Sequence, residues 1–227
     1  MPKYQVIRDV GHSLLGVLRS ELSAARAKGK AYLASPSAEF VRKNQPCLIL
    51  FLYDLRPSIR VGHEEKWELE EEIVDERGET QIVKYGRPLE LRLKYLLTAA
   101  ADDLGDEHEL LALGMKGFLD RPKLVGEQLA GDSFGKGDSL SVHHDNEFTL
   151  AISHAVLGGL GLGPKLAVGY QTDARLYSGR EIGRTRRVRE RHIDVFDQLR
   201  PPPGSISAKE LGVEAKPPRI VGPPGKK

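Results

Sequence analysis

The stretch RPLELRLKYLLTAAADD, Arg87 to Asp103, changes its character halfway along. In its first half Leu89, Leu91 and Leu93 alternate with charged residues, which is typical of a strand with one buried face. From Tyr95 to Ala101 nearly every residue is apolar or small, as in a strand that is buried on both faces. The sequence therefore predicts a long strand whose first half projects from the core.

The stretch CLILFLYDLRPSIRV, Cys47 to Val61, has the opposite order. It is apolar on both faces as far as Tyr53, and from Asp54 onwards apolar and polar residues alternate. Antiparallel pairing would place the two buried halves side by side and the two alternating halves side by side. We therefore predict that these stretches are neighbours in a central sheet. Pro57 cannot donate a hydrogen bond to a neighbouring strand, so we expect an edge or a bend there.

The spacing of apolar residues and the positions of turn and capping residues predict the other elements. The first are a helix from Tyr4 to Lys28, a short strand at Ala31–Ser35 and a hairpin over Trp67–Tyr85 that turns at Arg77–Gly78; its acidic run EEKWELEEE is either the polar side of one arm or an exposed, solvated loop. A helix follows Asp106 with a buried stripe of Leu111, Met115, Phe118 and Leu119. The last are a strand over Ser139–His144, a helix capped by Asp145 with Phe148, Ile152, Ala155 and Val156 facing inward, and a strand over Pro164–Ser178. This mixture predicts an α+β fold with a central mixed or antiparallel sheet flanked by helices.

The composition changes after Ser178. The segment from Arg180 to Arg191 is strongly basic, and the end of the chain is rich in proline and glycine and poor in core residues. Such a composition is typical of chain that does not pack into a core. We therefore expect residues 2–178 to form a single domain and residues 179–227 to form a flexible basic, Pro/Gly-rich extension.

The overall composition is that of an ordinary globular protein. The 227 residues include 34 Lys and Arg against 32 Asp and Glu, a net charge of +2, which gives no general attraction to nucleic acid. Cys47 is the single cysteine, so no intrachain disulfide is possible. The N-terminus lacks the apolar core of a signal peptide, and no run approaches the roughly 20 apolar residues that span a bilayer. We expect the protein to be made and folded in the cytoplasm.

The motifs that resemble catalytic or metal sites fail on spacing. His143 and His144 are adjacent, so on a strand they point to opposite faces and do not share one ion easily, and His154 lies on the following helix. The loop GDSFGKGDS lacks the spacing of a phosphate-binding loop. The glycines of GGLGLG do not follow a strand, as a dinucleotide site requires. The residues predict no catalytic constellation, no cofactor and no metal site, which alone fits many kinds of protein; the expectation that the chain is not an enzyme rests on its resemblance to a known family.

The basic run Arg180–Arg191 leaves two alternatives open. The run either contacts nucleic acid, or it is a solvated linker or a segment that contacts an acidic protein surface. The run lacks the interleaved aromatic residues of a stacking surface. Glu181, Glu190 and Asp194 offset part of its charge. These two observations favour the linker.

The order of these segments resembles one protein family. The N-terminal helix, LILFLYDLRPSIRV, RPLELRLKYLLTAAADD with EHELLALGMKGFLDRPKL, and PKLAVGYQTDARL are similar to the N-terminal domain of the cap, or tail-terminator, proteins of phage-tail-like contractile injection systems. The most specific similarity is a Pro–Leu strand ending in Tyr-Leu-Leu-Thr-Ala, followed by a Glu-His-Leu-Leu helix that a proline ends. The resemblance covers about Tyr4 to Ser178. The Trp67–Tyr85 hairpin and the basic tail have no counterpart in it.

The resemblance implies a tail-terminator-like fold and a structural function. Such caps form a six-fold ring that sits on the last layer of inner tube and sheath, stops their polymerisation and holds the sheath during contraction. The implied partners are copies of the same chain, sheath and inner-tube proteins, with no small-molecule substrate, cofactor or nucleic acid. A nucleic-acid-binding module that uses Arg180–Arg191 is the main alternative, and a hydrolase or metal enzyme that uses His143, His144 and His154 is a second.

The predicted hairpin and the basic run supply candidate partner contacts. A strand pair that leaves the core would become buried when subunits form a ring, and an exposed edge would accept a strand from a sheath subunit. Exposed apolar residues tend to mark such interfaces. The candidate contact residues are Trp67, Leu69, Ile73, Ile82, Val83, Arg184, Arg186 and Arg187.

Overall fold

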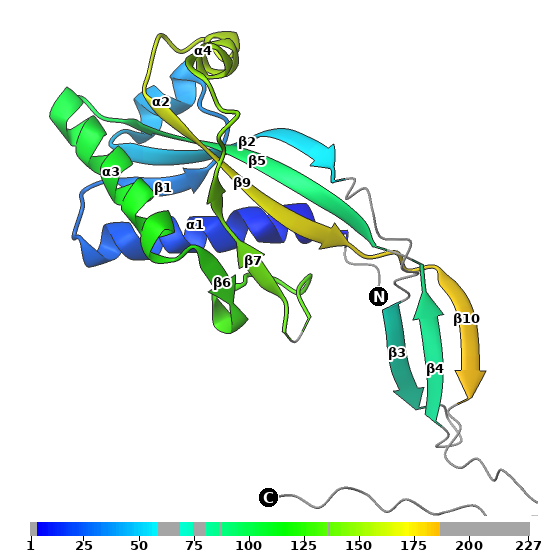
Figure 1. The fold of residues 1–227 in the computed structure, drawn as a ribbon. Coiled ribbons are helices and arrows are strands. Elements are labelled where there is room, and N and C mark those ends of the chain that lie inside the picture. Colours follow the sequence, from blue (N-terminus) through cyan, green and yellow to red (C-terminus); the bar gives the residue numbers. More distant parts are fainter. Residues whose placement is uncertain (1–3, 59–68, 75–79, 87, 136, 187–227) are drawn as a thin grey trace, which may run out of the picture. The chain divides into compact units, whose positions relative to one another are not determined.

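The computed structural model of the chain describes residues 4–58, 69–74, 80–86, 88–135 and 137–186. Its centre is a five-stranded sheet with the strand order β1-β2-β5-β9-β8 (Figure 1). These strands are β1 (Lys30–Leu33), β2 (Cys47–Pro57), β5 (Leu89–Ala100), β9 (Ala167–Leu176) and β8 (His143–His144). The pair β1 and β2 is parallel and the other neighbours are antiparallel. The predicted α+β fold with a central mixed sheet is confirmed.

The predicted pairing of β2 with β5 is also confirmed. The register runs from Cys47 opposite Ala100, through Phe51 opposite Leu96, to Pro57 opposite Leu91. Residues 47–50 and 93–100 are buried, whereas 55–57 are exposed and 89–92 range from buried to exposed. The two buried halves therefore lie side by side, as do the two alternating halves.

A β-bulge between Leu52 and Asp54 changes which face of the sheet the following side chains of β2 point to. Leu48, Leu50 and Leu52 face the main core, and an unbroken alternation would turn Asp54 to the same side. The extra residue, Tyr53, shifts the alternation by one position, because two residues of the bulged strand oppose one of its partner. Asp54 then lies opposite Lys94, on the other face of the sheet.

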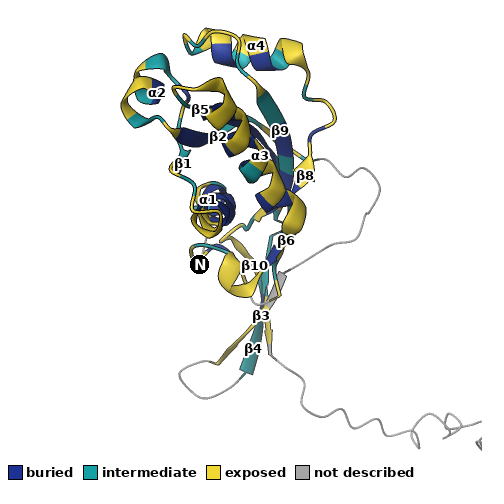
Figure 2. Cartoon of the chain, turned by 90° about the vertical axis from the view of Figure 1, so that its left-hand side faces the viewer, coloured by how far each residue is buried: buried dark blue, intermediate teal, exposed yellow. Residues whose placement is uncertain are grey.

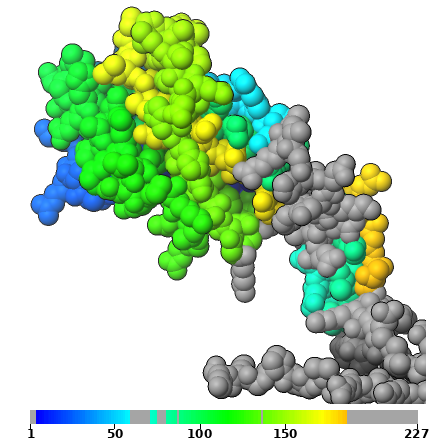
Figure 3. Space-filling view, in the orientation of Figure 1, coloured from blue at the N-terminus to red at the C-terminus, as the bar shows by residue number. Residues whose placement is uncertain are grey.

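Helices α1 (Val6–Ala24) and α3 (Leu104–Asp120) pack on one face of the sheet, which we call the inner face. Buried residues follow one side of α1 and run along β2, β5 and β9 (Figure 2). A left-handed residue, Arg26 at φ 52°, follows the end of α1, so this helix is shorter than predicted. In the space-filling view, α3 and the segment after it cover the sheet (Figure 3).

The sequence predicted the position of α3 but only half of its buried stripe. Asp103 caps this helix, with its carboxylate accepting from the amides of Gly105 and Asp106. Leu111 and Phe118 are buried as predicted, but the prediction for Met115 and Leu119 is wrong, because both are exposed. The helix instead approaches the sheet through Gly114, where an added Cβ would lie 2.8 Å from a Leu48 methyl group.

Helices α2 (Ala38–Asn44) and α4 (Leu150–Gly159) differ more from the sequence analysis, which did not predict α2. Val41 of α2 packs with Cys47 and Ile49 in a second, smaller core on the outer face. In α4 the buried residues are Ser153 and Leu157, so the predicted inward stripe is wrong for the exposed Ala155. The helix begins at Leu150, which leaves Phe148 outside it.

The predicted strand over Ser139–His144 is two separate strands. β7 (Ser139–Ser141) pairs with β6 (Lys123–Val125) in a small two-stranded sheet, and a short 3-10 helix, η1 (Gly126–Gln128), follows β6. The next two residues after Val142 form β8, which pairs with β9 of the main sheet. The chain therefore passes from one sheet to the other at Val142, whose amide donates to the carbonyl of Pro122.

A three-stranded sheet has the order β10-β4-β3, with β3 (Leu69–Val74), β4 (Thr80–Tyr85) and β10 (Glu181–Arg186). The pairing of Leu69 with Tyr85 and of Val74 with Thr80 confirms the hairpin, whose predicted turn at Arg77–Gly78 lies outside the described residues. The sequence analysis did not predict β10.

The compact unit that contains these sheets extends from Met1 to Arg186. The predicted boundary at Ser178 and the flexible extension stay predictions, since 187–227 lie outside the described residues.

Replacing Gly169 with alanine should destabilise the protein. A Cβ at this position on β9 would lie 2.3 Å from the Cβ and 2.4 Å from the Cγ of Phe148, so the ring would have to move out of a packed position. We expect the free energy of unfolding to fall by about 1–3 kcal/mol, as for other overpacked cores, measured by urea denaturation. The control Gly158→Ala adds a Cβ with nothing within 4 Å and should raise stability by up to about 1 kcal/mol. Equal stability of Gly169→Ala and the wild type would contradict the packing of Phe148 on β9.

Candidate functional site

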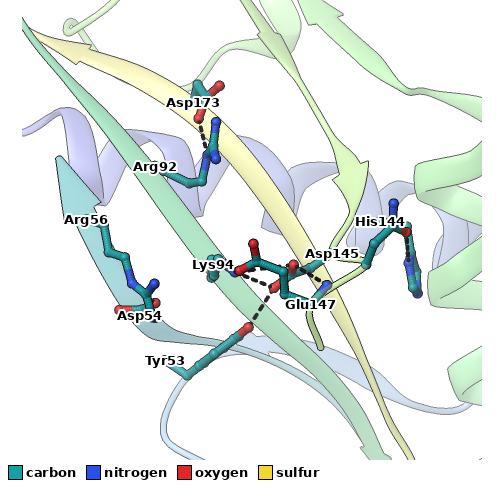
Figure 4. Close-up of polar contacts among 10 residues, drawn as sticks. Tyr53, Asp54, Arg56, Arg92, Lys94, His144, Asp145, Glu147 and Asp173 are labelled. Carbon is teal, nitrogen blue, oxygen red and sulfur yellow. Dashed lines mark hydrogen bonds and ion pairs between the residues drawn. The ribbon is translucent and has the colours of Figure 1, made fainter. Parts of the chain in front are cut away.

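Charged side chains gather on the outer face of the central sheet, where β2 and β5 carry their alternating halves (Figure 4). Arg92 of β5 lies directly opposite Asp173 of β9, and its Nε donates to Oδ1 of that carboxylate at 3.1 Å. Two residues along, Glu90 lies opposite Arg175, with 3.6 Å between Oε1 and Nε. Opposite charges across paired strands stabilise a sheet, so these rows keep the outer face polar and ordered.

A buried ion pair joins the segment after β8 to this face. Lys94 Nζ lies 3.1 Å from Asp145 Oδ2 and donates to Glu147 Oε2 at 2.7 Å. The hydroxyl of Tyr53, the bulge residue, donates to Asp145 Oδ2 at 2.8 Å. The side chains of Lys94 and Asp145 are only 6% and 1% exposed. Both charges are therefore removed from water and depend on each other.

The pKa shifts agree with this arrangement. Burial alone would raise the pKa of Asp145, but hydrogen bonds from Tyr53, Lys94 and the Glu147 amide outweigh it and hold the pKa below its ordinary value. Burial likewise opposes the charge of Lys94, and the two carboxylates raise its pKa. Both groups are charged at neutral pH. The pKa of Tyr53 is raised by burial and by its bond to Asp145, so the phenol remains a donor.

The sequence analysis missed this network. It assigned Asp145 as a helix cap, which is wrong, because the hydroxyl of Thr149 accepts from the Ile152 amide at the start of α4. The available signal was Lys94 in LRLKYLL, a lysine at the point where the strand becomes buried. A buried ammonium group needs a carboxylate partner, but the sequence does not indicate which carboxylate reaches it.

The three-stranded sheet holds all six of the predicted contact residues that the structure describes. Ile73 is exposed, Ile82 is half-buried and Arg184 is exposed. Val83 is fully buried, so the exposed contact expected there is not present. Leu69 lies in β3 and Arg186 in β10. Trp67 and Arg187 lie outside the described residues.

Cross-strand register decides which of these residues share a face. Val83 lies opposite Glu71 of β3 and opposite Arg184 of β10, so these three residues form one row on one face. Ile73 lies opposite Gln81, two residues from Val83, and therefore shares this face. Ile82 points to the opposite face.

Part of the predicted basic run is paired within its own sheet. Arg184 donates through Nε and Nη2 to the two carboxylate oxygens of Glu181, at 2.9 and 3.0 Å. The bond from Arg184 lowers the pKa of Glu181. Residues 187–191 lie outside the described residues, so the nucleic-acid alternative stays a prediction.

The histidines of the metal alternative lie apart from Asp145. His143 and His144 are exposed on β8, and His154 is exposed on α4, while Asp145 turns to Lys94. Within the described ranges, no group of three or more His, Cys, Asp and Glu residues is placed to hold a metal ion. Burial raises the pKa of the Cys47 thiol to about 11. No helix in the described part of the chain is both long and apolar enough to cross a membrane.

The loop GDSFGKGDS packs on the first helix. Ser133 Oγ donates to Oδ2 of Asp9 at 2.6 Å, and both residues are buried. At Gly131, which has a φ of +85°, an added Cβ would lie 2.3 Å from the Asp9 carboxylate carbon. The described residues of the loop therefore surround a carboxylate, which is the wrong charge for a phosphate site.

Comparisons with known proteins agree with the sequence resemblance and confirm it. A family model described as the Pvc16 N-terminal domain matches residues 9–188. The sheath/tube terminator of PVC, an extracellular contractile injection system, in its extended state has a TM-score of 0.56 and 14% identity, and covers 91% of this chain and 67% of that chain. The anti-feeding prophage cap, a tube terminating cap, has the same TM-score and identity, with 85% and 62% covered. At this identity they share the fold.

This chain thus spans about two thirds of the length of those two chains. No protein among the curated sequences matches it significantly.

Replacing Lys94 with methionine should destabilise the protein strongly at pH 7. Asp145 would keep its burial and lose its main cation, which typically costs about 3–5 kcal/mol. In the wild type the lowered pKa of Asp145 adds stability above its ordinary pKa, and this is lost as the pH falls through the folded value. In the variant burial would raise that pKa, so we expect the loss to be smaller at pH 4 than at pH 7.

Urea denaturation at both pH values measures this difference. The matched control is Arg92→Met, which removes a cation from a pair whose side chains are each 42% exposed. Such a pair contributes less than about 1 kcal/mol. Equal losses for the two variants at pH 7 would show that the Lys94 pair is not the buried interaction described above.

Proposed function

Since this chain belongs to the Pvc16 N-terminal domain family, we propose that it is a structural cap, or tail terminator, of a contractile injection system. The single observation that carries the proposal is the family match over residues 9–188, which spans both the five-stranded and the three-stranded sheet. In this proposal identical subunits form a ring, with six copies as the family resemblance implies. The ring ends the inner tube and sheath and anchors the sheath during contraction.

The surface of the three-stranded sheet supports an assembly function. Three apolar side chains on this small sheet, Ile73, Val74 and Ile182, are 39%, 66% and 52% exposed. Ile73 and Val74 are adjacent and point to opposite faces of β3, and Ile182 lies on β10, so both outer strands of this small sheet expose apolar side chains that a contact with another protein would bury. We therefore propose this sheet as the main contact surface of the ring.

The proposed partners are copies of this chain and the sheath and inner-tube proteins of the same particle. The two solved structures with this fold are named as a sheath/tube terminator and a tube terminating cap, which supports this choice of partners. We propose that the cap assembles in the cytoplasm as part of a phage-tail-like particle. The proposed role needs no reaction, no cofactor and no small-molecule substrate.

The first test is the mass of the protein in solution at micromolar concentration, alone and with sheath subunits. We expect a particle with six times the mass of the 25.1 kDa chain, either for the protein alone or only when sheath subunits are present. Exposed apolar surface on each copy would be buried in that particle, which is the physical reason to expect association. A monomer under both conditions would overturn the proposed function.

The double variant Ile73→Asp with Ile82→Asp should remain folded and form no ring. The two residues lie on opposite faces of the hairpin, so the charges would oppose burial of either face against a partner. Circular dichroism and thermal unfolding would establish the fold, and light scattering the mass. Leu119→Asp, at an exposed position of α3, is the control and should assemble normally. Normal rings of the double variant would exclude the hairpin as an assembly surface.

A further inference from the structure

The two edges of the three-stranded sheet carry opposite charges. β3 and β10 are its outer strands, with β4 between them (Figure 1). β3 contains three consecutive glutamates, Glu70 to Glu72, whereas β10 contains Arg184 and Arg186 with one glutamate, Glu181. Among the described residues no strand pairs with either outer strand on the side away from β4, where its backbone N–H and C=O groups form a template for another strand.

The register places these charges at the same level of the sheet. Both outer strands are antiparallel to β4, so they are parallel to each other. Glu71, Val83 and Arg184 form one row across the sheet, and Glu72, Ile82 and Thr185 form the next. After a register shift near Glu181, the pairing of β10 is regular from Gly183 to Arg186. The regular part of β10 therefore carries the two arginines.

We propose that β3 of one subunit pairs in parallel with β10 of the next subunit, so that the three-stranded sheets join edge to edge around the ring. This inference rests on the proposed cap function and names the contact that closes its ring. A rotation that keeps neighbouring copies at one level would place Glu71 of one copy beside Arg184 of the next. The two charges would then be one strand spacing apart, on the same face of the joined sheet.

Charge decides between this contact and its symmetric alternatives. Pairing of β3 with β3 of a second copy would oppose glutamates to glutamates, and pairing of β10 with β10 would bring arginines together. Like charges on directly opposed strands are destabilising, and opposite charges are stabilising. The two edges therefore select a head-to-tail contact, which is the kind of contact that generates rings rather than two-fold dimers.

The side chains near the joint fit this contact. Arg184 is exposed and is held in place by Glu181 and Gln81, and Val83, its neighbour in the same row on β4, is fully buried. Ile73 and Val74 of β3 and Ile182 of β10 are exposed in the single chain. Ile73 and Ile182 would each gain a neighbouring strand at opposite ends of the joint, while the charges of Glu71 and Arg184 between them select the partner strand. The surface thus has an apolar part that gains from burial and a charged part that sets the orientation.

Two reversals of charge test the pairing, under the conditions in which the wild type forms rings. Glu71→Arg would place an arginine beside Arg184 of the next copy, and Arg184→Glu would place a glutamate beside Glu71 of the next copy. Each variant alone should need at least about ten-fold more protein for half-assembly, as expected when opposed edges carry like charges. An equimolar mixture of the two should assemble again, because each variant then pairs only with the other. Arg175→Glu, which removes another exposed arginine paired with a glutamate, is the control and should assemble as the wild type does.

A cysteine pair gives an independent readout that does not depend on changed stability. In the variant Glu72→Cys with Thr185→Cys, which keeps Glu71 and Arg184, the two cysteines of one chain are separated by β4, at about twice the 4.8 Å strand spacing. That exceeds the span of about 7 Å between Cα atoms that a disulfide can bridge, so an intrachain bond is excluded. The native Cys47 is buried. We expect oxidation to give a ladder of covalent oligomers on a denaturing gel, whereas each single-cysteine variant gives dimers at most.

The outcomes separate this inference from the proposed function. Intact rings in both charge-reversal variants, or no ladder from the double-cysteine variant while the wild type forms rings, would overturn the pairing and leave the cap function standing. Loss of sheath binding with intact rings would assign these edges to the sheath, and would also overturn it. A wild type that is monomeric with and without sheath would instead overturn the proposed function itself. Failure of both single variants with recovery of the mixture would support the pairing.

Discussion

The antiparallel register of β2 and β5 is the constraint on which the rest of the structure depends. Each strand is buried on both faces in one half and on one face in the other, and the pairing of Cys47 with Ala100 brings the matching halves together. A slip of one residue would turn every side chain of a strand to the wrong face. With the register fixed, α1 and α3 cover the inner face, α2 covers the buried half of the outer face, and the other half is left for charged residues.

The bulge at Tyr53 makes that register compatible with both faces. It turns Asp54 outward after three inward-facing leucines, and it places the phenol of Tyr53 against Asp145. Asp145 in turn holds Lys94, a cation on a strand that is otherwise buried around it. The segment that carries Asp145 also brings Phe148 over Gly169 and against Tyr53, with ring centroids 5.7 Å apart. The bulge residue Tyr53 therefore affects three features at once: the inward and outward alternation of side chains along β2, the buried ion pair, and the packing of the segment before α4.

Elements with a strong repeat could be predicted from the sequence, and those that depend on tertiary partners could not. The pairing of β2 with β5 follows from two long strands, of 11 and 12 residues, that each combine an alternating half with a continuously apolar half, and the hairpin β3–β4 follows from a polar turn between two arms. Helix α2 has seven residues, too few for a readable period, although Ser37 accepts from the Phe40 amide as an N-cap does. The sequence of β10 resembles that of a basic linker, because a strand on a small exposed sheet has little apolar alternation. Its pairing with β4 makes it a strand. Asp145 has the ordinary appearance of a helix cap, and only the three-dimensional approach of Lys94 gives it another role.

The two sheets differ in how far their outer strands are protected from pairing with another chain, and this difference matters for assembly. The outer strands of the five-stranded sheet are short, with four residues in β1 and two in β8, and Arg19 Nε donates to the outward carbonyl of Ala31 in β1 at 3.4 Å. Short edges that side chains partly occupy are a common protection against pairing with another chain.

The outer strands of the three-stranded sheet have six residues each, and their opposite charges disfavour self-pairing without blocking the backbone groups. The domain thus limits pairing on its core sheet and retains it on the three-stranded sheet. In the described part of the chain, one connection between the two sheets begins at Gly86 after β4 and another spans 177–180. Those connections are themselves joined by a hydrogen bond from the Gly86 amide to the Arg180 carbonyl. An assembly contact formed on that sheet would leave the core pairing of β2 and β5 unchanged, so subunits would join without any rearrangement of the element that determines the fold.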